Sequence, residues 1–157
     1  VAATCIAGCS SKATTDPGGG NNTACPVTLS GAITATSACT VSATYARIVL
    51  GRSDFSILNS GSPGFTLGVT IDGKFASGTI TQSSNGVEQA ITTASNNDLI
   101  WSQTISDPAR GTVTVVFSSV SLGSDGYTFT VHGTADGTMA PEPNSSATGT
   151  VTFHVTF

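Results

Sequence analysis

The two histidines of this sequence, His132 and His154, are the side chains best able to do metal chemistry. Each is out of phase with the alternating apolar residues beside it, so both are expected on the solvent-facing side of their strands. If the last two strands form a hairpin centred on Pro143, His132 lies directly opposite His154, and Asp136 lies on the same face. Opposed side chains have Cβ atoms about 4.5–5.5 Å apart, so these three residues could bind Zn²⁺ or Cu²⁺. The alternative, which we favour, is two ordinary exposed histidines in a ladder of threonines, with no metal and no other cofactor.

The single tryptophan, Trp101, lies in a polar segment together with Asn97 and Gln103. An aromatic ring flanked by amides resembles a platform on which a sugar stacks while the amides bond to its hydroxyls. The alternative is that Trp101 fills the core, since it has the same parity as Leu99. We favour the core position and keep the sugar platform as a second interpretation.

Catalysis is difficult to assemble from these residues. The sequence contains no Gly-x-Ser-x-Gly elbow and no His-Glu-x-x-His motif. A glycosidase-type pair needs two carboxylates facing one cleft, but both glutamates, Glu88 and Glu142, fall in polar, loop-like segments. The aspartates mostly neighbour Gly, Asn or Pro, where turn and capping roles explain them. We therefore expect a protein that is not an enzyme and has no catalytic residues.

The composition excludes some partners. Charged residues make up 9% of the chain, against about 25% in an ordinary soluble domain. With 5 Lys and Arg residues and a net charge of −4, the chain cannot build the strong basic patches that nucleic-acid binders need. We expect no nucleic-acid partner.

The cysteines point to an exported protein. The segment Ile6–Cys9 resembles a bacterial lipobox, in which Cys9 would carry the lipid and residues 1–8 would be a signal-peptide remnant. Residues 9–24 then comprise the lipidation site and a flexible tether rich in Gly, Ser, Thr and Asn. Cys25 and Cys39 remain, and in an oxidising compartment we expect them to form a disulfide.

From residue 25 onward the apolar residues alternate with period two, which is typical of strands with one buried face. A clear example is the alternating segment 65–71, which is followed by Asp72-Gly73, a two-residue hairpin signal. The pattern predicts about 8–10 short strands, arranged as a two-sheet sandwich or a small barrel. Of these we expect an all-β, antiparallel two-sheet sandwich, immunoglobulin-like or jelly-roll-like, that forms a single domain over residues 25–157.

Taken together, the lipobox-like motif, the tether, the Cys25 and Cys39 pair and the terminal segments 127–134 and 148–153 resemble the small, uncharacterised all-β lipoproteins of bacterial envelopes. The resemblance implies export and a lipid anchor on Cys9 at the outer membrane or cell surface, and this group has no agreed activity to carry over. Our leading interpretation is a non-catalytic binding or structural module. One alternative is a subunit of an extracellular fibre, a homo-oligomer assembled by strand addition at edge strands. Another is a carbohydrate-binding module with a polysaccharide partner.

Overall fold

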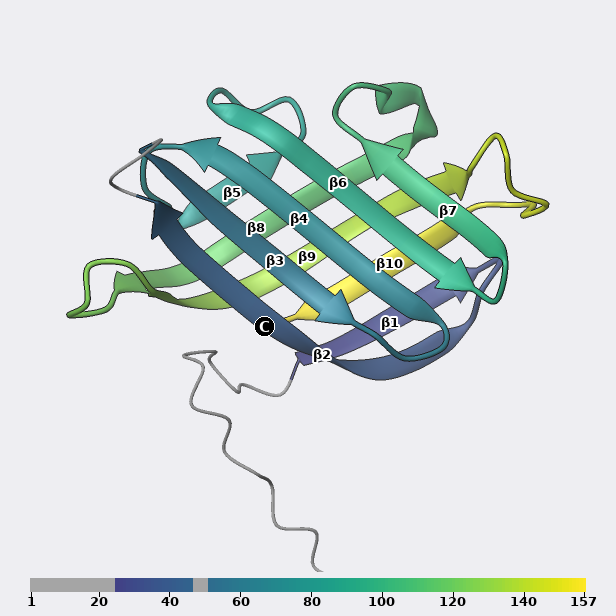
Figure 1. Cartoon of the computed structure of the whole chain (residues 1–157), viewed down its shortest axis with the longest axis horizontal. Coiled ribbons are helices and arrows are strands. Elements are labelled where there is room, and N and C mark those ends of the chain that lie inside the picture. Colours follow the sequence, from purple (N-terminus) through teal and green to yellow (C-terminus); the bar gives the residue numbers. More distant parts are fainter. Residues whose placement is uncertain (1–24, 47–50) are drawn as a thin grey trace, which may run out of the picture.

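The computed structural model describes residues 25–46 and 51–157. The lipobox-like motif, Cys9 and the tether lie outside the described residues. Ten strands and one short 3-10 turn make up the described chain (Figure 1). The elements are β1 (Cys25–Gly31), β2 (Ala35–Ala46), β3 (Arg52–Asn59), β4 (Gly64–Asp72), β5 (Gly78–Thr81), β6 (Val87–Asn96), β7 (Leu99–Thr104), η1 (Pro108–Arg110), β8 (Gly111–Leu122), β9 (Phe129–Pro141) and β10 (Val151–Thr156). The all-β prediction and the predicted number of strands are confirmed.

The strands form a closed antiparallel barrel of eight strands, not the two-sheet sandwich that we expected. The order around the barrel is β10-β1-β2-β3-β4-β6-β7-β9, and β9 pairs with β10 to close it. Strands β8 and β5 extend the sheet from the other edge of β9. Figure 1 shows β3, β4, β6 and β7 in front, crossing β8, β9 and β10 behind.

Two long strands account for the difference between sandwich and barrel. Strand β2 pairs with β1 through its first half and with β3 through its second half, so the sheet continues around the corner without an edge. Strand β9 pairs with β8 and β10, and its C-terminal end pairs with β7. In both architectures alternate residues face the core, so the sequence pattern is the same for either.

The interior of the barrel is filled by large apolar side chains. In β10, for example, Val151, Phe153 and Val155 are buried and the residues between them are exposed. The largest fully buried side chains include Trp101, Phe55, Phe65, Phe117 and Phe153. The outward positions carry mostly Thr and Ser, so the hydroxyls give this weakly charged protein its polar surface.

Two inward-facing glycines of β9 make room for the phenylalanines of the C-terminal segment. Gly137 lies directly opposite Phe153, and Gly133 exchanges two backbone hydrogen bonds with Phe157. A Cβ atom on Gly137 would lie 2.0 Å from the backbone carbonyl oxygen of Thr112 on β8 and 2.7 Å from the Phe153 ring. Small residues on β9 therefore complement large residues on its partner, which lets the interior reach native packing density.

The expected disulfide between Cys25 and Cys39 is confirmed. The two residues are directly opposed in the β1–β2 pair, with Cα atoms 5.0 Å apart. The bond therefore ties the start of β1 to the middle of β2, close to the point where β2 turns from one wall of the barrel to the other.

We expect Gly137→Ala to lower the free energy of unfolding by about 1–3 kcal/mol, the usual cost of overpacking a filled core. Urea denaturation measures this as a lower midpoint with an unchanged slope. The matched control is Gly68→Ala in β4, because no atom lies within 4 Å of the Cβ position there. Equal stability of the two variants would show that neither the Thr112 carbonyl nor the Phe153 ring requires glycine at position 137.

Candidate functional site

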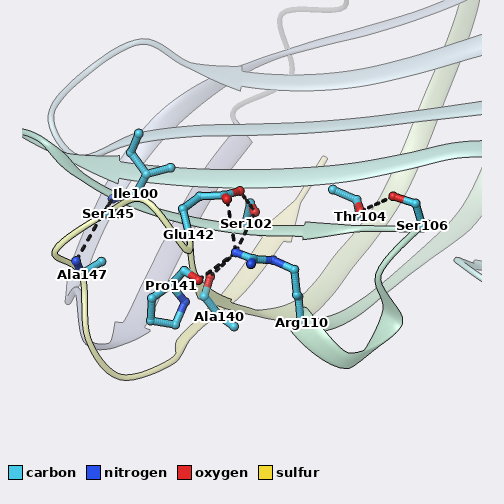
Figure 2. Close-up of polar contacts among 10 residues, drawn as sticks. All are labelled: Ile100, Ser102, Thr104, Ser106, Arg110, Ala140, Pro141, Glu142, Ser145 and Ala147. Atoms are coloured by element: carbon cyan, nitrogen blue, oxygen red, sulfur yellow. Dashed lines mark hydrogen bonds and ion pairs between the residues drawn. The ribbon is translucent and has the colours of Figure 1, made fainter.

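A polar cluster at the seam between β7 and β9 is the most highly connected group of polar side chains in the described structure (Figure 2). We call Ser102, Arg110 and Glu142 the closure cluster. Ser102 has the outward parity of β7, between the inward-facing Trp101 and Gln103, yet only 4% of it is exposed. Arg110 and Glu142 cover it from η1 and from the segment that follows β9.

Each of the three side chains of the closure cluster contacts the other two. The Ser102 hydroxyl donates to Oε1 of Glu142. The Arg110 guanidinium donates to Oγ of Ser102 at 3.2 Å and to the carbonyl of Pro141 at 2.8 Å, and it lies 3.5 Å from Oε2 of Glu142. The Glu142 amide also donates to the carbonyl of Ile100, which extends the pairing of β7 with the end of β9.

The geometry of the closure cluster favours cross-linking over catalysis. A serine bonded to a carboxylate could form a nucleophile and its base, but Ser102 is covered, so a substrate cannot reach its hydroxyl. Arg110 also pairs with the carboxylate and holds it as a hydrogen-bond acceptor. The β7–β9 pairing consists of two residue pairs, Trp101 with Pro141 and Ser102 with Ala140. The cluster therefore supplements the shortest pairing in the ring.

Sequence reasoning assigned Glu142 to a loop and missed this cluster. Its three members come from separate elements, with Ser102 and Glu142 40 residues apart, so no local motif marks them. The sequence held one weak signal of this cluster. Charged residues are so few in this chain that each glutamate is a candidate for an ion pair with an arginine. Glu88, the other glutamate, also pairs with an arginine, since Arg52 reaches both of its carboxylate oxygens at 2.5 Å.

The histidines occupy a different register from the one we expected. His154 lies opposite Asp136, and its Nδ1 is 2.5 Å from the Asp136 carboxylate. His132 lies opposite Ser119 on β8. Asp136 is four positions after His132 on β9, which places His132 about 13 Å away along the strand. The expected pair of opposed histidines is therefore corrected to a His154–Asp136 pair.

The register differs because the β9–β10 connection is not a tight hairpin around Pro143. β9 ends at Pro141 and β10 begins at Val151, and the segment between them packs against β7 through the Glu142 amide. His132 instead lines a shallow pocket of about 280 Å³ with Ser118, Gly133 and Thr156 among its other walls. Within residues 25–46 and 51–157, no three His, Cys, Asp or Glu side chains lie close enough together to hold a metal ion.

The three residues of the expected sugar platform do not share an exposed surface. Trp101 is 2% exposed, and its indole Nε1 donates to the carbonyl of Gly149 at 3.1 Å. Gln103 is fully buried. Asn97 is exposed in the turn between β6 and β7, with a positive φ of 54°. Trp101 takes the core position that its parity favoured.

The described side chain with a clearly shifted pKa is Asp125, in the β8–β9 turn. Its carboxylate accepts hydrogen bonds from the backbone amides of Tyr127 at 2.9 Å and Thr128 at 3.0 Å. These bonds favour the ionised form and hold the pKa of Asp125 below its usual 3.8.

Because its folded-state pKa is lowered, Asp125 should stabilise the fold above pH 3.8, and this contribution should disappear as the pH falls through the folded pKa. Asp125→Asn removes the titration but keeps an acceptor oxygen. We expect the stability difference between wild type and Asp125→Asn to be constant near neutral pH and to shrink below pH 3.8. Denaturant unfolding measured across this pH range tests the expectation. An NMR titration that places the pKa of the Asp125 carboxyl at or above 3.8 would contradict it.

Replacing Arg110 with methionine keeps the aliphatic stem but removes the cation that pairs with Glu142 and the donor to the carbonyls of Ala140 and Pro141. We expect a loss of about 1.5–3 kcal/mol, the range for hydrogen bonds to charged groups, because the Arg110 side chain is only 15% exposed. The matched control is Arg52→Met, which breaks an exposed ion pair worth less than about 1 kcal/mol. Urea denaturation compares the two. Hydrogen exchange should also show faster exchange of the Glu142 amide in Arg110→Met alone.

No family of proteins, no curated protein and no solved structure matches this chain at a significant level. In the described ranges, no helix is both long enough and apolar enough to cross a lipid bilayer. The assignment of function therefore depends on the residues and the geometry set out above.

Proposed function

We propose that this protein is an exported, non-catalytic binding or structural module, held at a bacterial outer membrane or cell surface by a lipid on Cys9. The observation that carries the proposal is the disulfide between Cys25 and Cys39. Disulfides persist in oxidising compartments and are rare in the cytosol. Cys25, one of the two bonded cysteines, is the first residue of β1 and directly follows the sequence that resembles a lipobox and tether.

The arrangement of polar groups supports a non-catalytic role. The serine and carboxylate of the closure cluster bind each other and Arg110 at the seam, and the side chains that fill the barrel interior are mostly aromatic and aliphatic. A partner would therefore meet the outer surface. One continuous row across that surface runs through Thr36, Thr28, His154, Asp136 and Thr114 on five adjacent strands.

Intact-mass spectrometry of the protein from the membrane fraction of its own cells tests the anchor. We expect a chain that begins at Cys9, carries acyl groups and has lost two hydrogens at the Cys25–Cys39 disulfide. Cys9→Ser should move the protein out of the membrane fraction. Cys5→Ser is the matched control, because it changes a cysteine of the same segment and should leave the anchor intact. An unlipidated chain that retains residues 1–8 would overturn the proposal.

The second candidate is a subunit of an extracellular fibre, and the open edge of the sheet favours it. β5 ends the sheet and covers only Thr114–Phe117 of β8. The side chain of Gln82 bonds to the backbone of Gly111 and Val113, but no described strand pairs with this edge of β8 along residues 118–122. A strand from a second copy could pair there. Sedimentation velocity of the unlipidated chain decides this, because a strictly monomeric protein at all concentrations would remove the fibre candidate.

The carbohydrate-binding alternative rested on Trp101, Asn97 and Gln103. Since two of these three side chains are buried, it has no remaining support from a shared site, and we do not propose it.

A further inference from the structure

A pair of polar side chains faces the interior of the barrel where β6 meets β7. Thr92 of β6 and Gln103 of β7 are directly opposed in the antiparallel pair. Both are fully buried, with no exposed surface. They stand among apolar neighbours, because Ala90 and Ala94 flank Thr92 along β6 and Trp101 precedes Gln103 on the inner face of β7.

Three polar atoms of this pair have no hydrogen-bond partner within the described part of the protein. They are Oγ1 of Thr92 and both amide atoms of Gln103, Nε2 and Oε1. Buried polar groups in native proteins nearly always have a partner, from the protein or from an ordered water. Two adjacent buried residues with three unpartnered atoms therefore indicate a binding site for something small and polar.

We propose that Thr92 and Gln103 form an internal hydration site that holds one or two long-lived water molecules. The ligand must both donate and accept hydrogen bonds, because Nε2 of Gln103 is a donor, Oε1 is an acceptor and the Thr92 hydroxyl is both. It must also be small and neutral, since none of the buried polar residues is charged. Buried waters typically make about three hydrogen bonds, and three unpartnered atoms are available here.

The number of protein ligands argues against a cation at this position. One amide oxygen and one hydroxyl oxygen are far fewer than the six to eight oxygen ligands that Ca²⁺ takes.

The proposed water site and the closure cluster lie on opposite faces of β7, because Gln103 directly follows Ser102. Water would bind on the inner side of the strand whose outer side is held by the closure cluster.

Water–protein NOE and ¹⁷O relaxation dispersion measurements on the oxidised 157-residue chain test this site. We expect long-lived water with cross-peaks to the Gln103 side-chain amide protons. The ¹⁷O relaxation dispersion of this water should disappear in the double variant Thr92→Val, Gln103→Met, where the Gln103 amide cross-peaks are removed by the substitution itself. The matched control is Thr93→Val, which removes the neighbouring hydroxyl on the opposite face of β6 and should retain the signal.

Two results would overturn the proposal. The first is the absence of long-lived water at the Gln103 amide in the wild-type protein. This would be observed if the amide and the Thr92 hydroxyl were bonded directly to each other. The second is a long-lived water that persists unchanged in the double variant. If the double variant fails to fold, Thr92→Val alone decides the question, because loss of one partner should shorten the residence time of the water without removing the Gln103 amide.

Discussion

The position of β9 between three partners is the constraint on which the rest of the structure depends. β8 lies on one edge, β10 lies on the other, and the C-terminal end of β9 meets β7 to complete the ring. A closed sheet leaves no edge along the ring, so its strands must tilt and stagger together. The register of β9 therefore determines which side chains meet along β7, β8 and β10, including the pairing of Gly137 with Phe153.

The seam between β7 and β9 shows how side chains compensate for a short backbone pairing. Two residue pairs join the strands there, and Arg110 then binds Ser102, Glu142 and the carbonyl of Pro141 on the outer side. Since few other charges exist in this chain, the ion pair stands out from a surface of hydroxyls. On the inner side of the same strand, Gln103 lies opposite Thr92 and adds a polar group to a mostly apolar interior. β7 thus carries polar groups on both of its faces.

This distribution of polar groups is consistent with the function that we propose. In many enzymes, carboxylates and hydroxyls are left accessible in a cleft, where their pKa values are matched to a reaction. Here Ser102 and Glu142 bind each other and Arg110, while the large side chains of the core occupy the interior. What remains accessible is the outer face, whose regular rows of threonine offer hydrogen bonds without net charge. A module of this kind would act through its surface and through its attachment.

Local patterns in the sequence by themselves determined that the protein is all-β and which positions face inward, because alternation is a property of short segments. The pairing of Cys25 with Cys39 was predicted only after the lipobox interpretation set the other two cysteines aside, and the structure contains this disulfide. Local patterns also placed Trp101 correctly in the core, since parity with its neighbours was enough. Only the tertiary structure decided that the sheet closes into a barrel, because the alternation of buried and exposed residues along a strand is the same in a barrel and in a sandwich. It also decided the partner of His154, because register depends on how the connection before β10 packs against β7. The closure cluster was invisible for the same reason, since its residues meet only when distant strands close the ring.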